Sequence, residues 1–463
     1  MNISLFADRR ACGVAAVLLL AAARPAWADL NKVPGLTVVQ APVAAAIQQV
    51  CPALGGLVNR QAATAQQIQL FSACSKMVQT SNVQQGAKES SLNLGLDEAQ
   101  LRVGLQGIAP EELSAQGYRA MSGSRNAVNG RLLALRGGAH GFLVSSNRSG
   151  NESAATGLAH GPADSPRGGA AGSTPLAGPW GGFVNANYNQ GDRDRTDYEN
   201  AYDFRNAGVT VGADYRVTER LVFGGAVSRD SSSSDFEAAT GNVEARANGL
   251  MLYGSYNANA AYVEGHLSHS RIDYDSERRI VVSSLTPVSG INTSARGGTQ
   301  GTQNTAALGT GYEAKFGKST LIPFLRVEYL RNDIDAFTET EDSSSLGFDV
   351  MEQSVESLQS SLGLRYSFTH SAPAGVWVPY VGLEWSHEFR NDSRNIVAKY
   401  THDPFNNFFA IPTQKPDRDF ATLSLGVSAQ FPGGLSGFVN LDSVQGLRDT
   451  SNTGLTLGLR QEF

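Results

Sequence analysis

The spacing of apolar residues changes once along this chain and divides it into regions. From residue 29 to about residue 137, apolar side chains recur every three to four residues, as on one face of a helix. From residue 179 to residue 463 they alternate with polar residues, as in half-buried strands. Residues 138–178 between them are rich in Gly, Ser, Ala and Pro, which predicts a flexible linker.

The helical region begins with a predicted hairpin of two helices. In "APVAAAIQQVCPALGGL", Val43, Ile47 and Leu54 share one face, and the helix is expected to end at the Gly55-Gly56 pair. The segment "AATAQQIQLFSACSKMVQ" repeats the apolar spacing and predicts the second helix.

Two further helices are predicted before the linker. Asp97 and Gln100 have the spacing of a capping box at the start of the third helix. Pro110 suits the first turn of a fourth helix, over "APEELSAQGYRAM".

Twelve strands are predicted from the alternation over residues 179–463. They cover approximately residues 180–190, 206–217, 219–229, 244–257, 260–273, 303–316, 319–332, 355–369, 376–389, 418–431, 435–444 and 452–463. Short turns follow the even strands, and long polar loops, such as residues 276–301, follow most of the odd ones. This sorting is typical of an outer-membrane barrel with its turns in the periplasm, whereas a β-sandwich has no reason for it.

Charges of both signs recur on one side of these strands, opposite to the apolar residues. In the last strand, Leu455, Leu457, Leu459 and Phe463 share the side opposite to Arg460 and Glu462. An arginine on the lipid side near the midplane would cost roughly 2–4 kcal/mol, so we expect the charges to face a wet lumen. The predicted lumen-facing charges are Glu264, Arg326, Glu328, Arg365, Glu384, Arg460 and Glu462. The predicted fold class is an all-β transmembrane barrel of about twelve antiparallel strands with a small N-terminal α-helical region.

Residues 1–28 have the pattern of a secretory signal peptide. Arg9 and Arg10 precede an apolar run, and Ala-Trp-Ala stands before Asp29, where the mature protein is expected to begin outside the cytoplasm. No later apolar run reaches the roughly 18 residues of a membrane helix. The net charge of -6 gives no basic field for nucleic acid.

Cys51 and Cys74 lie one on each helix of the predicted hairpin. Outside the cytoplasm a disulfide is the expected state of such a pair. It would stabilise the hairpin by about 3 kcal/mol. A zinc pair is the competing interpretation, but no His lies between Asp29 and Ala139, so carboxylates would have to complete the site.

Several segments of the predicted barrel resemble the autotransporters of type V secretion, notably "LIPFLRVEYL", "VWVPYVGLEWSHEF" and "GLTLGLRQEF". The order of signal peptide (1–28), helical region (29–137), linker (138–178) and barrel (179–463) is also similar. Leu455, Leu457, Leu459 and Phe463 resemble the C-terminal signature that the outer-membrane barrel-assembly machinery reads.

The resemblance implies a barrel in the outer membrane of a Gram-negative bacterium that translocates or displays its own N-terminal region, the passenger. Its expected partners are outer-membrane lipid and lipopolysaccharide, the barrel-assembly machinery and periplasmic chaperones; the ligand of the passenger is unknown. The passenger is short and helical here, whereas a long β-helix is usual in the family. The Asn406-Asn407 pair falls in a predicted external loop, so self-cleavage between two asparagines inside the barrel is not expected.

Two other functions compete with export of the passenger. One is a porin-like or anchoring barrel that keeps the helical region in the periplasm, and the remote one is a hydrolase at the barrel rim. The second would use Glu264, His266 and Ser268, which share a face, but ordinary lumen lining explains them better. We predict no enzyme activity, catalytic residues, cofactor or metal site.

Overall fold

The computed structural model describes residues 29–110, 113, 132, 179–431 and 435–462. The predicted signal peptide and linker, most of the fourth predicted helix, and Phe463 lie outside the described residues.

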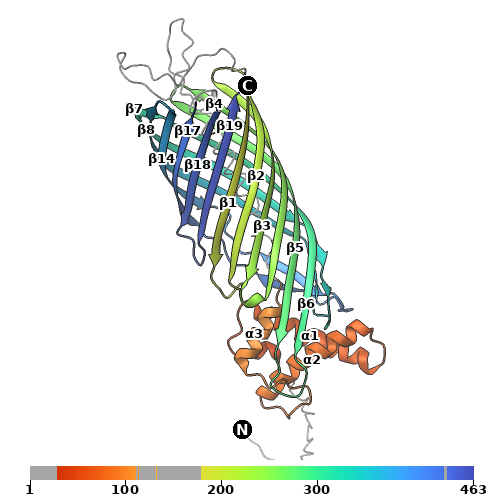
Figure 1. Ribbon diagram of the computed structural model, residues 1–463. Helices are drawn as coiled ribbons and strands as arrows, with labels where there is room; N and C mark the ends of the chain where they lie inside the picture. Colours follow the sequence, from red (N-terminus) through yellow and green to blue (C-terminus); the bar gives the residue numbers. More distant parts are fainter. Residues whose placement is uncertain (1–28, 111–112, 114–131, 133–178, 432–434, 463) are drawn as a thin grey trace, which may run out of the picture.

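Twelve antiparallel strands close into a barrel, which confirms the predicted fold class (Figure 1). The ring closes because the first strand pairs with the last. The strands are β1 (Trp180–Arg193), β2 (Tyr202–Arg216), β3 (Leu221–Phe236), β4 (Gly241–Ala258), β5 (Ala261–Val282), β6 (Ile291–Tyr312), β8 (Ser319–Ile334), β12 (Gln353–Phe368), β14 (Gly375–Glu388), β17 (Asp419–Gln430), β18 (Leu435–Gln445) and β19 (Asn452–Glu462). Two short strands, β7 (Ala314–Phe316) and β13 (His370–Ala372), lie in the turns after β6 and β12.

Side chains alternate between an exposed outer side and a covered inner side along these strands. On β19, Leu455, Leu457 and Leu459 are 38%, 44% and 59% exposed, whereas Arg460 between them and the chain end is 6% exposed. Exposed aliphatic and aromatic residues recur on the outer side of every barrel strand, as a lipid-facing wall requires.

The two ends of the barrel differ in their connections. β1 begins where β19 ends, since Gly181 pairs with Glu462, and the short turns lie at this same end, which we call the short-turn end. At the opposite, long-loop end, a four-stranded sheet forms from β9 (Phe337–Thr338), β11 (Phe348–Val350), β15 (Asn395–Tyr400) and β16 (Phe409–Pro412). The strand β10 (Thr340–Glu341) and the 3-10 helix η2 (Glu237–Ala239) also belong to these loops.

The prediction of a polar loop over residues 276–301 was wrong. β5 and β6 are 22 residues each and stay paired out to Val282 and Ile291, so the hairpin projects beyond the other strands (Figure 1). Ile280, Val282 and Ile291 on its covered side are buried against the N-terminal helices. The extra pairing is stable because another part of the chain covers its apolar side.

The helices are η1 (Leu30–Lys32), α1 (Gln40–Asn59), α2 (Ala65–Gln84) and α3 (Glu98–Ile108). Asp97 and Gln100 form the predicted capping box at the start of α3, with Gln100 N donating to Asp97 Oδ1 over 2.8 Å. Thr64 and Gln67 form a second capping box at the start of α2. All three α-helices lie together at the long-loop end of the barrel (Figure 1).

The predicted end of the first helix at Gly55-Gly56 was also wrong, because α1 continues to Asn59. A Cβ atom on Gly55 would lie 2.9 Å from Cε2 of Phe71 on α2. Gly55 therefore permits close approach of the two helices, and it does not mark a chain reversal.

Candidate functional site

The two helices of the hairpin are covalently joined. Cys51 on α1 and Cys74 on α2 form a disulfide with a Cα–Cα distance of 5.8 Å, as predicted. Both sulfurs are buried in the core of the helical region, so the pairing excludes the zinc interpretation.

Several of the charged residues singled out in the sequence lie on the covered side of the barrel strands. Arg326 on β8 pairs with Glu384 on β14, with Nη2 and Oε1 2.5 Å apart. The guanidinium of Arg365 lies 5.0 Å from the centre of the Tyr380 ring. Glu264 and Glu328 lie half-buried on the same inner side of β5 and β8. The side chain of Glu462 lies outside the described residues, as does Phe463.

Other candidate residues of the sequence occupy separate places. His266 and Ser268 are buried at consecutive inner positions of β5, next to Glu264. Asn406 and Asn407 lie in the loop between β15 and β16, where Asn407 Oδ1 accepts a hydrogen bond from Gln49 Nε2 of α1 over 2.8 Å. In the described part of the chain, no group of three or more His, Cys, Asp or Glu side chains is arranged to hold a metal ion.

An apolar cluster occupies part of the barrel interior. Its members from the wall are inward-facing residues of β1 to β5 and β8, including Phe183, Met251 and Ile272. Leu113 and Leu132 of the N-terminal region are buried in this same cluster. The N-terminal region therefore contributes side chains to the interior of the barrel as well as to its long-loop end.

The helices and the long-loop end share one hydrophobic core. This core joins buried residues of α1, α2 and α3 to the tip of the β5–β6 hairpin and to the four-stranded sheet, through residues such as Val282, Phe348 and Ile411. Helix α1 is long and apolar enough to cross a membrane by length and composition, but its apolar side packs in this core. The helical region is therefore docked on the barrel loops and has no separate core of its own.

Arg278 on β5 connects the C-terminal end of α3 to the β5–β6 hairpin by a hydrogen bond. Its side chain is 2% exposed, and its Nε donates to Oε1 of Glu339 over 2.9 Å. Nη1 donates to the carbonyl of Ile108, the last residue of α3, over 2.5 Å. A cation at this point satisfies a helix C-terminal carbonyl and favours the negative end of the helix dipole.

Backbone contacts extend the attachment on the other side of the hairpin tip. Leu285 N donates to the Leu94 carbonyl over 2.8 Å, and Thr286 Oγ1 donates to the Asn93 carbonyl over 2.7 Å. A Cβ atom on Gly104 of α3 would lie 3.1 Å from Cγ2 of Val282, which is tighter than an ordinary contact, so the glycine suits this close approach of α3.

Two titratable groups flank the Arg278–Glu339 pair. Burial raises the pKa of Glu341 to about 7, and the neighbouring Glu339 adds to that increase. Burial lowers the pKa of His402, whose Nε2 lies 3.7 Å from Oε1 of Glu341. The edge of the docking site therefore contains groups that change charge near neutral pH.

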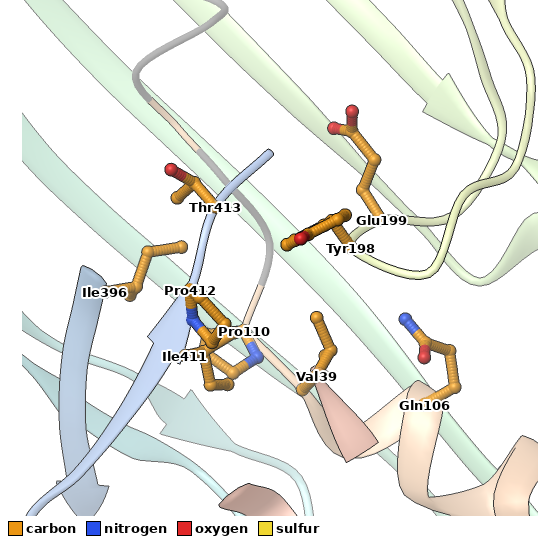
Figure 2. Close-up of a pocket in the computed structure, with 10 residues that line it drawn as sticks. Val39, Gln106, Pro110, Tyr198, Glu199, Ile396, Ile411, Pro412 and Thr413 are labelled. Atoms are coloured by element: carbon orange, nitrogen blue, oxygen red, sulfur yellow. The ribbon is translucent and has the colours of Figure 1, made fainter. Parts of the chain in front are cut away.

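A crevice lies where α1, the end of α3 and the barrel loops meet (Figure 2). Val39, Gln106 and Pro110 line it from the helical region, and Tyr198, Ile396 and Ile411 are among the residues that line it from the loops. Its volume of about 20 Å³ holds about one water molecule, so it is a packing defect of the docked interface and offers no space for a substrate.

Sequence reasoning missed the docking site, although one signal was present. Ile280, Val282 and Ile291 continue the apolar alternation into the segment that was predicted to be a polar loop. The Arg278–Glu339 pair has no comparable signal, because its members are 61 residues apart in a charge-rich segment.

Comparison with known proteins identifies the barrel. The family model for the autotransporter beta-domain matches residues 182–442, which is more than half of the chain. No curated protein matches the sequence.

Solved structures with similarity to the chain include three autotransporter barrels. The translocator domain of NalP from Neisseria meningitidis has 16% sequence identity, a TM-score of 0.48, and coverage of 62% of this chain and 89% of that one. The beta domain of Brka from Bordetella has 15% identity, a TM-score of 0.45 and coverage of 62% and 100%. The transport unit of AIDA-I from Escherichia coli has 12% identity, a TM-score of 0.40 and coverage of 74% and 98%.

The family match falls on the closed barrel, from Gly182 in β1 to Asp442 in β18. The chain therefore belongs to the autotransporter family, and its barrel is an outer-membrane translocator of a Gram-negative bacterium.

Proposed function

We propose that this autotransporter displays its short helical passenger on the cell surface and keeps it attached to the barrel. The observation that carries the proposal is the shared hydrophobic core between the helices and the long-loop end. In an outer-membrane barrel the long loops are extracellular and the short turns are periplasmic.

The path of the chain supports export through the barrel. The helices end at the long-loop end with Ile108, whereas β1 begins at the short-turn end with Trp180. A connection outside the wall would run through lipid, where each unpaired backbone polar group costs several kcal/mol. Leu113 and Leu132 lie in the interior cluster, so the connection through the lumen is the favourable one.

The extent of the attachment supports a passenger that is retained after export. Burial of Val282, Phe348 and Ile411 with the helices is accompanied by the Arg278 hydrogen bonds and the two backbone contacts at Leu94 and Asn93. Release would expose this apolar surface to water at about 25 cal/mol per Å².

Like autotransporter barrels in general, this one contacts the outer membrane and its assembly machinery. We propose in addition that it binds lipopolysaccharide and periplasmic chaperones during assembly. The role of the barrel in this proposal is mechanical and uses no catalytic residues, with His266, Ser268 and Glu264 as lining of the lumen.

An engineered disulfide tests display directly. A Cβ atom on Gly104 would lie 3.7 Å from Cβ of Val282, which matches the Cβ–Cβ distance of natural disulfides. We expect Gly104→Cys with Val282→Cys to crosslink in intact cells. After cleavage at a protease site inserted in residues 138–178, the helical fragment should then stay attached to the barrel until a reductant is added.

The matched control is Gly107→Cys with Val282→Cys. Gly107 is one helical turn further along α3 and a Cβ there would have nothing within 4 Å, so this pair should not crosslink. An uncrosslinked Gly104–Val282 pair would contradict display. A tag inserted near Ser90 that resists external protease until the outer membrane is permeabilised would favour the periplasmic alternative.

A further inference from the structure

The outer side of β3, β4 and β5 carries cations where its apolar band ends. Val227 on β3 and Leu250 on β4 are the last exposed apolar residues toward the extracellular end. The next outward residue on β3 is Arg229, and Asn248 follows Leu250 on β4. On β5, Leu267 is followed outward by His269 and Arg271.

The strand register brings these polar residues into one row. Arg229 pairs with Asn248, and Asn248 pairs with Arg271, so the three side chains lie side by side on the outer surface. The two arginines are therefore two strand spacings apart, which is about 10 Å between their Cα atoms. Two guanidinium groups with an amide between them form a short cationic row at the border of the lipid-facing wall.

Acidic residues do not neutralise this row. In the described part of the chain neither Arg229 nor Arg271 forms an ion pair, and Arg271 donates only to the neutral amide of Gln300. Two of the outward acids nearby have other cationic partners, since Asp275 pairs with Arg246 and Asp333 pairs with Arg331. The third, Asp273, reaches the row only through Gln300, which donates to it and accepts from Arg271.

The row differs from the border of the wall on the opposite strands. On β14, the outward residues at the extracellular border are Trp385, His387 and, just beyond the strand, Phe389. The aromatic rings suit the membrane interface in the usual way, and His387 lies 2.8 Å from an acid, Asp419. On β3 and β5 guanidinium groups follow directly where the exposed apolar band ends.

We propose that Arg229, Asn248 and Arg271 form a binding site for the phosphate groups of a phosphorylated glycolipid of the outer leaflet, the lipid A part of lipopolysaccharide. Arginine donates paired, charge-assisted hydrogen bonds to phosphate oxygens, and Asn248 adds a neutral donor between them. The acyl chains lie against Val227, Leu250 and Leu267 directly below. The inference rests on the proposed binding of lipopolysaccharide, for which it names the site, and it is independent of where the passenger ends up.

The test titrates the full chain in detergent with lipid A that carries both phosphates and with the same lipid after removal of its phosphates, and measures occupancy by native mass spectrometry. We expect the wild type to bind the phosphorylated lipid at least about tenfold more tightly. Arg229→Gln with Arg271→Gln should remove most of this preference, and Arg229→Lys with Arg271→Lys should retain part of it.

Arg279→Gln is the matched control, because Arg279 is on the outer side of β5 eight residues beyond Arg271, about 26 Å further along the strand from the apolar band. Its binding should equal that of the wild type. Equal affinity of the wild type for both lipids would overturn the proposal whether or not the variants fold. Full competition by inorganic phosphate would also overturn it, because the ligand would then be a soluble anion.

Discussion

Arg278 and Glu339 are buried charges on which the attachment of the passenger depends. Both side chains are almost completely inaccessible, and together they satisfy the Ile108 carbonyl and the amide of Phe348. A buried pair of this kind contributes little net stability over an apolar pair, but loss of one partner leaves an uncompensated charge.

Arg278→Ala is therefore expected to weaken docking of the helices by about 3–5 kcal/mol, because Glu339 would remain buried without its partner. The measurement is protease sensitivity of the helical region in a purified barrel that remains folded. Arg296→Ala is the control, since Arg296 is half-exposed and pairs with Asp342 at the surface, where loss of a pair costs about 0–1 kcal/mol.

Because the pKa of Glu341 is raised, docking of the helices is expected to depend on pH. Its pKa is raised from 4.5 to about 7, so the docked state binds a proton that the undocked carboxylate releases. This contribution is fully present below pH 4.5 and is lost as the pH rises through about 7. His402, whose pKa is lowered, acts in the opposite direction as the pH falls through its ordinary value of 6.5.

The substitution Glu341→Gln distinguishes the contribution of Glu341 to the pH dependence from that of His402. The variant should lose the stabilisation that the wild type gains between pH 7.5 and pH 5, as followed by the urea concentration that undocks the helices. An unchanged difference between these two pH values in the variant would rule out Glu341 as its source.

At the scale of secondary-structure elements, a disulfide joins the two helices of the hairpin, α1 and α2. Cys51 and Cys74 are 23 residues apart, and closing a loop of that length stabilises the hairpin by about 3 kcal/mol. Replacing both with serine should lower the urea midpoint of the helical region, measured by its far-ultraviolet helical signal. The barrel itself should be unaffected, so the difference in its migration between unheated and heated samples on SDS gel electrophoresis should stay unchanged.

Substitutions on the outer side of the last strand, β19, test whether this side of the barrel faces lipid. Leu457 lies between Ala186 and Val439 on the outer side, and an arginine there is expected to destabilise the barrel by about 2–4 kcal/mol. Thr453→Arg provides a depth control on the same side of β19, four residues toward the extracellular end, where the cost should fall to about 0–1 kcal/mol. Equal unfolding midpoints in urea for the two variants would argue against a lipid boundary at this position.

In the whole molecule the barrel and the passenger share one hydrophobic core. A substitution that disrupts the packing in this core should therefore undock the passenger from the barrel. Gly104→Leu places a large side chain against Val282, where a Cβ atom alone already makes a tight contact of 3.1 Å, and overpacking of this kind costs about 1–3 kcal/mol. We expect faster proteolysis of α1 to α3 on intact cells and an unaltered barrel. Gly107→Leu, on an open side of the same helix, should have no such effect.

Local patterns predicted most of the architecture. All twelve barrel strands were predicted, because a strand with lipid on one side and water on the other must alternate, but the extracellular ends of β3, β5 and β6 extend seven to twelve residues beyond their predicted bounds. The hairpin and its disulfide were predicted because helical spacing and a pair of cysteines are also local signals. Gly55 was misinterpreted because glycine at a helix end and glycine at a helix contact look the same in sequence.

The sequence by itself determined which face of each strand and helix is apolar, and therefore that the strands form a closed barrel. Together with the two cysteines, it also determined the disulfide-linked helical hairpin. Only the tertiary structure decided where the apolar face of the helices is buried, namely on the projecting β5–β6 hairpin at the long-loop end. The physical reason is that periodicity reports whether a face must be covered, whereas the partner that covers it is chosen by shape and by pairs such as Arg278 with Glu339 and with Ile108, which are distant along the chain.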